Sequence, residues 1–165
     1  APTAGLHFTR ETFDQLTERG IETVEVTLHV GYGTFEPVRV ENIAEHSVSP
    51  ERFSISENAA LMLNSARSNG RRIVAIGTTT TRALESSMQH HGEFRAGNDI
   101  ADLTILPGYS FKAVGALLTN FHLPQSSLLI LTSTFGGHKL IMDAYRHAVA
   151  AGYRFYSYGD CMFIK

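Results

Sequence analysis

The sequence has little of what defines several large classes of protein. Its single cysteine, Cys161, excludes an intrachain disulfide framework and suits a reducing cytoplasm. No apolar run approaches the roughly 20 residues that cross a bilayer. The formal net charge is only −2, which gives no overall electrostatic footprint for nucleic acid. We therefore expect a cytoplasmic protein with no membrane partner, in which any contact with RNA is local.

Several catalytic motifs are also missing. There is no His-Glu-x-x-His and no cysteine pair, and the adjacent His90 and His91 cannot share one helical face, so we predict that no metal is bound. No Gly-x-Ser-x-Gly elbow is present. A small-molecule α/β hydrolase is therefore a disfavoured alternative.

The chain nevertheless has the material for a folded domain. Its 165 residues are 43% hydrophobic, enough for one core, and no linker or repeat divides them, so we predict a single domain over residues 1–165. The first residues, Ala1 to Gly5, include no initiator Met, basic segment or apolar signal core. We expect the chain to be a fragment of a longer protein.

Caps, glycines and hydrophobic periodicity predict alternating helices and strands. Helices are expected over about 9–19 (with Phe13 and Leu16 inward), 54–69, 82–89 and between Gly137 and Gly152. Strands are expected over 21–28, 73–76, 102–106 and 153–158, with a loop over 90–98 and apolar runs at 117–118 and 128–131. This order predicts the α/β class, with a mixed, largely parallel sheet flanked by helices.

The most informative stretch is 117–127, where the polar Thr119, Asn120 and His122 lie between two apolar runs. Pro124 disfavours a helix across this cluster, and Ser126 or Ser127 can cap the next helix. Taken alone, it could be a buried turn whose polar groups bond the backbone. Similar clusters recur at the ends of other apolar runs, as expected of a site built from strand ends. We predict that one cleft gathers His7, His29, Thr34, Thr79, Asn120, His122 and Asp160.

A glycine- and threonine-rich turn, 77–81, joins the strand at 73–76 to the next helix. Backbone N–H groups at Thr78 and Thr79 could bind an anionic or polar group, although a plain Thr-capped helix is the more ordinary explanation. Arg82 could bind an anion or pair with Glu85, and Glu85 could face a ligand or solvent. Asp160 could act as a base or cap a turn.

Together these segments resemble one family. They are 1–9 (APTAGLHFT), 27–38 (TLHVGYGTFEPV), 76–79 (IGTT) with Arg82, Leu84 and Glu85, 107–109 (PGY) with Phe111, 117–124 (LLTNFHLP) and 153–160 (YRFYSYGD). Each resembles a signature of the S-adenosylmethionine:tRNA ribosyltransferase-isomerases of queuosine synthesis, and they occur in the same order. The resemblance covers roughly the C-terminal half of a family member, so much of the family's inserted β-barrel domain would be absent.

The resemblance implies an enzyme that uses S-adenosylmethionine as ribosyl donor, without a metal. The acceptor would be the aminomethyl group of a 7-deazaguanine at the anticodon wobble position of tRNA, and the product epoxyqueuosine. A base must remove a proton beside the sulfonium, and histidine or carboxylate suits that role near neutral pH. We expect a monomer with two groups of site residues. The catalytic candidates are His7, His29, His122 and Asp160, and the substrate-binding candidates are Gly31, Gly33, Thr34, Thr78, Thr79, Arg82, Glu85, Asn120 and Tyr158.

Some positions depart from the family's pattern. Ser47-Val48-Ser49 stands where His-Met-His is usual, Ala101 and Thr104 replace a Thr and a Phe, and Cys161 replaces an Ala. The lost histidines leave open a noncatalytic tRNA-binding protein as the alternative. Because much of the barrel domain would be missing, we expect these 165 residues alone to be inactive.

Overall fold

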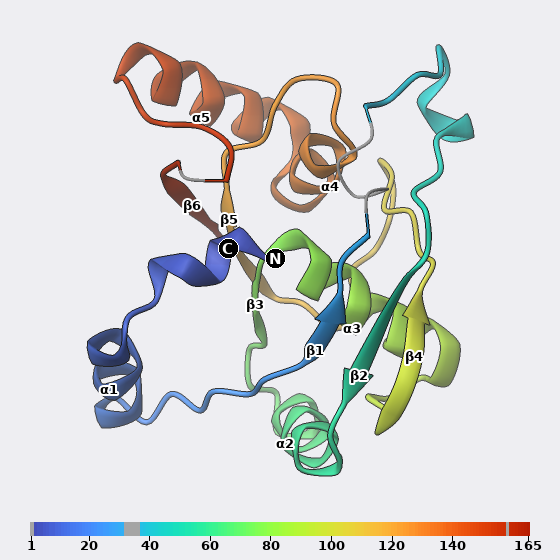
Figure 1. Ribbon diagram of the computed structural model, residues 1–165, viewed down its shortest axis with the longest axis vertical. Coiled ribbons are helices and arrows are strands. Elements are labelled where there is room, and N and C mark those ends of the chain that lie inside the picture. The colour runs from blue at the N-terminus through green and yellow to red at the C-terminus, as the bar shows by residue number, and fades with distance from the viewer. Residues whose placement is uncertain (1, 32–36, 158) are drawn as a thin grey trace.

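The computed structural model describes residues 2–31, 37–157 and 159–165, which form two three-stranded sheets and five α-helices (Figure 1). One sheet has the order β1 (Thr27–His29), β2 (Glu51–Ile55), β4 (Gly97–Ala101). The other has the order β3 (Val74–Ile76), β5 (Ala116–Asn120), β6 (Cys161–Ile164). The predicted α/β class is confirmed.

The expected dominance of parallel pairing is wrong. Among the strand pairs that the structure describes, only β3 and β5 are parallel. The β1–β2, β2–β4 and β5–β6 pairs are antiparallel. The sequence pattern shows which segments are extended but carries no direct record of strand direction, which depends on the path of the connections.

The helices are α1 (Arg10–Glu18), α2 (Glu57–Ser68), α3 (Thr78–His91), α4 (Ser127–Gly136) and α5 (His138–Ala150), with short 3₁₀ turns η1 (Thr3–His7) and η3 (Ile43–Glu45). The predictions for α1, α2 and α5 are confirmed to within a few residues. The caps are Thr9 for α1, Ser56 for α2 and Ser126 for α4. None of the described helices is long and apolar enough to cross a membrane.

Helix α3 is the centre of the fold. It contacts strands of both sheets, and ten of its 14 residues are buried. It begins at Thr78, earlier than the predicted Arg82, although β-branched residues are weak helix formers. Burial overrides that preference, and the Thr80 and Thr81 hydroxyls donate to the carbonyls of Ile76 and Gly77, at 2.9 and 3.1 Å.

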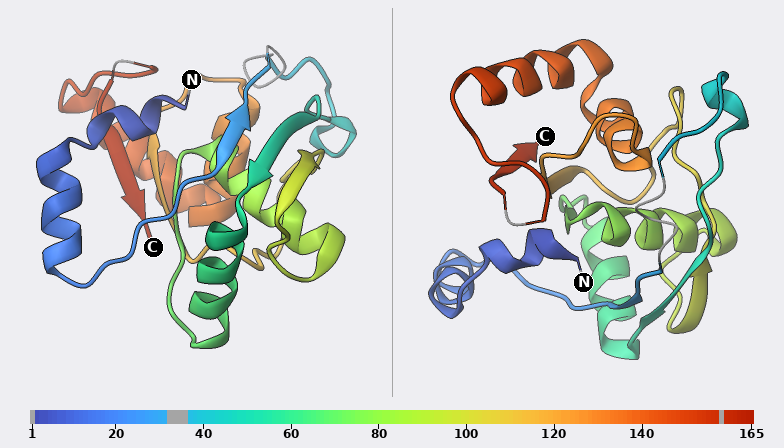
Figure 2. Two further views of the ribbon diagram at one scale, coloured as in Figure 1. Left: turned by 60° about the horizontal axis from the view of Figure 1, so that its bottom comes forward. Right: turned by 45° about the horizontal axis from the view of Figure 1, so that its top comes forward.

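Helix α1, in contrast, lies at the edge of the molecule in every view (Figures 1 and 2). None of its residues is buried in the described structure. The expectation that Phe13 points inward is wrong, because its side chain is 44% exposed and contacts the ring of Phe8.

Three strand predictions are wrong in position. Of the strand predicted over 21–28, only residues 27 and 28 pair in the sheet, together with the following His29. The strand expected at 102–106 instead lies at 97–101, partly within the predicted loop 90–98. This polar segment is β4, and it pairs with β2, a strand that the sequence analysis missed. The aromatic segment 153–157 packs its rings on Phe121 and Tyr145 instead of forming a strand, and the last strand is 161–164.

Candidate functional site

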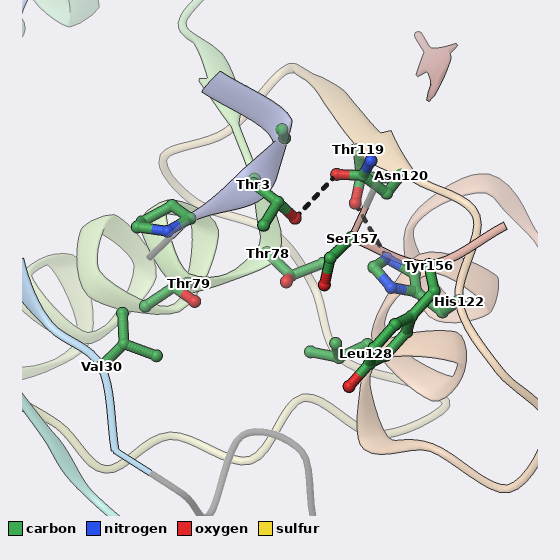
Figure 3. A pocket seen from close by; sticks show the side chains of 13 residues that line it. Thr3, Val30, Thr78, Thr79, Thr119, Asn120, His122, Leu128, Tyr156 and Ser157 are labelled. Atoms are coloured by element: carbon green, nitrogen blue, oxygen red, sulfur yellow. Dashed lines mark hydrogen bonds between the residues drawn. The ribbon is translucent and has the colours of Figure 1, made fainter. Parts of the chain in front are cut away.

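A pocket opens where the carboxyl ends of β3 and β5 meet the N-terminus of α3 (Figure 3). Segments distant in sequence complete it: Thr3 at the start of η1, Val30 after β1, Leu128 of α4 and Ser157 near the C-terminus. Its lining is Pro2, Thr3, Ala4, Val30, Gly77, Thr78, Thr79, Thr119, Asn120, His122, Leu128, Tyr156 and Ser157. None of these described residues is acidic, Lys or Arg, so the described lining combines apolar groups with uncharged polar ones.

His122 lies in the wall of this pocket and is 7% exposed. Its Nε2 lies 2.8 Å from the Thr119 hydroxyl oxygen, and its backbone N–H donates to the Tyr145 hydroxyl at 2.8 Å. Burial lowers the pKa of His122 to about 4, because a charged imidazolium would lose its hydration. The imidazole is therefore neutral at pH 7.

Asn120 is held from one side only. Its Oδ1 accepts a hydrogen bond from the Thr3 hydroxyl at 3.2 Å, whereas its buried Nδ2 has no partner among the described residues. Nearby, α3 begins after Gly77, whose φ of +95° favours glycine and which provides no side-chain cap. The interpretation of this turn as a plain Thr-capped helix is therefore wrong. Thr78 and Thr79 instead line the pocket at the uncapped helix end.

The other two candidate histidines do not line the pocket. His7 is exposed, and its ring nitrogens Nδ1 and Nε2 each lie 3.1 Å from a carbonyl oxygen, of Ala4 and Gly159. His29 is exposed in β1 opposite Arg52, while its neighbour Val30 reaches the pocket.

Asp160 closes a turn beside the pocket. Its Oδ2 accepts from the Arg154 backbone N–H at 2.8 Å, and its Oδ1 accepts from the Arg154 guanidinium at 3.0 Å. The hydrogen bond from the Arg154 side chain, followed by that from its backbone, lowers the pKa of Asp160. The carboxylate therefore stays ionised at neutral pH and has the turn-capping contacts considered from the sequence.

Arg82 points away from the pocket, into the core beside the β1-β2-β4 sheet. Its Nη1 lies 3.0 Å from Glu51 Oε2, and both side chains are 3% exposed. Its other N–H groups donate to the carbonyls of Ser49, Ala101 and Leu103. The alternative that Arg82 pairs with Glu85 is thus wrong, and the contacts of Arg82 are structural.

Glu85 is completely buried and anchors the loop after residue 107. Its carboxylate accepts four hydrogen bonds of 2.8–2.9 Å, from the Tyr109 hydroxyl and the backbone N–H groups of Lys112, Ala113 and Val114. Burial, followed by the hydrogen bond to Glu85, raises the pKa of Tyr109. Glu85 therefore neither faces solvent, as one alternative held, nor lines the pocket, as a ligand-facing group would.

The expected convergence is thus met in part. Thr79, Asn120 and His122 line one pocket, whereas His7, His29 and Asp160 do not; Thr34, Gly33 and Tyr158 lie outside the described residues. Gly31 does not line the pocket either, and its N–H donates to Glu51 Oε1 at 2.9 Å. Sequence reasoning missed Thr3, Tyr156 and Ser157 as lining residues. All three stand within the quoted segments, but the positive φ of Tyr156, +70°, has no signal in the sequence.

The fold and this pocket define an α/β protein whose candidate site lies beyond the carboxyl ends of adjacent parallel strands, a common place for ligand binding. The chain belongs to the family described as queuosine biosynthesis protein, whose model matches residues 1–164. The predicted resemblance is confirmed.

Named relatives agree with this assignment. The chain is 53% identical to the S-adenosylmethionine:tRNA ribosyltransferase-isomerase of Moorella thermoacetica and 54% identical to that of Symbiobacterium thermophilum, each over 99% of this chain and 48% of the relative. The crystal structure of S-adenosylmethionine tRNA ribosyltransferase from Thermotoga maritima matches with a TM-score of 0.79 and 41% identity, over 98% of this chain and 51% of that one. The chain thus spans about half the length of the relatives it matches.

Proposed function

We propose that the protein containing this chain transfers and isomerises the ribosyl unit of S-adenosylmethionine onto 7-aminomethyl-7-deazaguanine at the wobble position of tRNA, giving epoxyqueuosine. Similarity to relatives of that activity over 99% of the chain supports the proposal. The chain spans about half of each relative, so the activity is proposed for the whole protein and not for these 165 residues alone.

The observation that carries the proposal is the pocket around His122, whose described lining offers hydroxyl, amide and imidazole groups and no charged side chain. The reaction needs an unprotonated base beside a sulfonium cation, and an acceptor amine in its neutral form. The described lining has no Lys or Arg that would repel the sulfonium, and a neutral imidazole can accept a proton or a hydrogen bond. Of the four catalytic candidates, His122 is the one that we assign to contact with substrate. Roles for His7, His29 and Asp160 stay predictions.

For the pocket walls, we assign substrate binding to Thr78, Thr79 and Asn120. Asn120 Nδ2 is a buried donor without a partner in the described structure, and leaving such a group unpaired costs about 1–3 kcal/mol. A substrate oxygen or ring nitrogen that accepts from it would recover this free energy on binding. Arg82 and Glu85 are not included, because their hydrogen bonds lie inside the core.

The test compares wild type with His122→Gln in the full-length protein. Turnover is measured by mass spectrometry of tRNA nucleosides after incubation with S-adenosylmethionine, and folding by the melting temperature. Loss of a proton-transfer group should slow ribosyl transfer by about 10²–10⁴-fold, with little change in melting temperature. His147→Gln, a change of an exposed histidine on α5, is the control and should leave both unchanged.

Two outcomes would contradict the assignment. A large fall in melting temperature with an unchanged rate per folded molecule would make His122 a structural residue. Binding of tRNA by wild type without any ribosyl transfer would favour the noncatalytic alternative.

One observation bears on that alternative. The departures from the family's pattern at 47–49 and at Thr104 lie together, because the Val48 N–H donates to the Thr104 hydroxyl at 3.0 Å. Val48 is buried, and the Ser49 carbonyl accepts from Arg82. Val48 is therefore a core residue, whereas Ser47 and Ser49 are exposed, and none of these positions lines the pocket at His122.

A further inference from the structure

Two histidines and two aspartates gather at the end of α3 far from the pocket. His90 and His91 are adjacent and were predicted not to share one helical face, but α3 ends at His91 and β4 runs beside that end. Both rings reach one carboxylate. His91 Nε2 lies 2.9 Å from Asp99 Oδ2, and His90 Nδ1 lies 3.4 Å from Asp99 Oδ1.

The ligand atoms of His90, His91 and Asp99 all lie within 4.8 Å of one another. Tetrahedral coordination by nitrogen and oxygen at about 2.0–2.1 Å places ligand atoms about 3.3 Å apart. Small side-chain adjustments therefore suffice to close the set around one ion. The side chains are 28%, 24% and 21% exposed, which leaves an approach for the ion and room for water as a fourth ligand.

Asp102 adds the feature that distinguishes this cluster from a chance ion pair. Its Oδ1 lies 2.9 Å from His90 Nε2, the ring nitrogen opposite the one that faces Asp99. A carboxylate there holds the proton on Nε2 and leaves the Nδ1 lone pair directed at the shared site, as carboxylates do behind metal-bound histidines. The Ile100 N–H likewise orients Asp99, donating to its Oδ1 at 2.8 Å.

The charge balance also suits a divalent cation. With both imidazoles neutral, Asp99 and Asp102 give the site a charge of −2. Imidazole nitrogen with carboxylate oxygen is a donor set typical of zinc and similar transition-metal ions, whereas Mg²⁺ and Ca²⁺ prefer oxygen alone.

We propose that His90 Nδ1, His91 Nε2 and the Asp99 carboxylate bind a zinc-like divalent transition-metal ion, with Asp102 orienting His90. The ion would link the C-terminus of α3 to β4. It would thereby stabilise the packing of the β1-β2-β4 sheet on the helix whose opposite end forms the pocket. This proposal does not depend on the proposed function.

The experiment uses the full-length protein without a polyhistidine tag, stripped with EDTA and titrated with zinc chloride by calorimetry. Wild type should bind zinc saturably, and His91→Gln and Asp99→Asn should each remove one ligand and weaken binding at this site more than 100-fold. Asp102→Asn should weaken it by about 10–100-fold, as expected for a group behind a ligand. With cobalt as a spectroscopic probe, wild type should show the d–d absorption of a four-coordinate ion, and His91→Gln should lose it.

His138→Gln and His147→Gln change exposed histidines elsewhere and should bind zinc as wild type does. Far-UV circular dichroism of the metal-free variants checks folding, and His90→Gln provides a further ligand removal if one variant does not fold. Absence of saturable binding in wild type would overturn the proposal. So would zinc affinity and cobalt spectra that are the same in wild type, His91→Gln and Asp99→Asn.

Discussion

The middle of α3 and the pocket at its N-terminus both bury polar side chains, but they satisfy them differently. Arg82 and Glu85 are charged, and each makes four hydrogen bonds to core groups. Around the pocket, Asn120 and His122 are uncharged, and the buried Asn120 Nδ2 has no partner within the described structure. A buried charge without partners is too costly to keep, whereas a neutral group can hold hydrogen-bonding capacity in reserve for a ligand.

This difference separates two kinds of polar residue that the sequence does not distinguish. Thr79, Arg82, Glu85 and Asn120 were all predicted to bind substrate. Their surroundings assign Arg82 and Glu85 to stability and leave Thr79 and Asn120 as candidates for binding. The comparison can be tested by removing one group from each region and measuring the free energy of unfolding.

The largest loss is expected from the charged region. Arg82→Met removes the guanidinium that pairs with the 3% exposed Glu51 carboxylate. Breaking a buried ion pair in this way costs about 3–5 kcal/mol of the free energy of unfolding, measured by urea denaturation. The double variant Arg82→Met/Glu51→Leu, which removes both charges, should recover part of that loss. If Arg82→Met lowered the free energy of unfolding by less than about 1 kcal/mol, the ion pair would not be a structural requirement, and the proposed difference between the two regions would be wrong.

A smaller, pH-dependent effect is expected from His122. Its pKa of about 4 in the folded protein lies below the value of about 6.5 for an exposed histidine. Between these two pH values the unfolded chain binds a proton that the folded protein does not. The free energy of unfolding therefore falls as pH decreases through this range, by up to about 3 kcal/mol, and the effect is absent from His122→Gln.

The measurement is the difference in the free energy of unfolding between wild type and His122→Gln, obtained by urea denaturation at pH values from 7.5 to 4. Taking the difference removes the contribution of carboxylates, which both proteins share. If the two proteins lose stability in parallel over this range, His122 is not buried in its neutral form.

The smallest effect on stability is expected at the pocket wall. Thr3→Val keeps the shape of the side chain but removes the hydroxyl that donates to Asn120 Oδ1. One partly buried hydrogen bond between neutral groups contributes about 0.5–1.5 kcal/mol. The free energy of unfolding should therefore change by about 1 kcal/mol. On the proposed function, KM for S-adenosylmethionine in the full-length protein should rise, because Asn120 is no longer held in place. A destabilisation as large as that of Arg82→Met would show that the two regions do not differ.

Local signals in the sequence were sufficient for much of the helical structure. Thr9, Ser56 and Ser126 accept the capping hydrogen bonds, and the predicted helix between Gly137 and Gly152 is α5. These features depend on residues three or four apart, so a linear pattern records them. The polar cluster around Asn120 and His122 was found for the same reason, since its members are close in sequence.

What only the tertiary structure decided depends on contacts between distant segments. β4 is too polar to be identified as a strand until β2 pairs with it. The alternatives for Arg82 stay open until the fold brings it beside Glu51, 31 positions away. The same holds for Thr3 beside Asn120, 117 positions away, and for the histidines that reach Asp99. By itself the sequence determined the family, the α/β class and most helices. Burial and long-range pairing, which have no fixed spacing along the chain, decided which polar residues stabilise the core and which line the pocket.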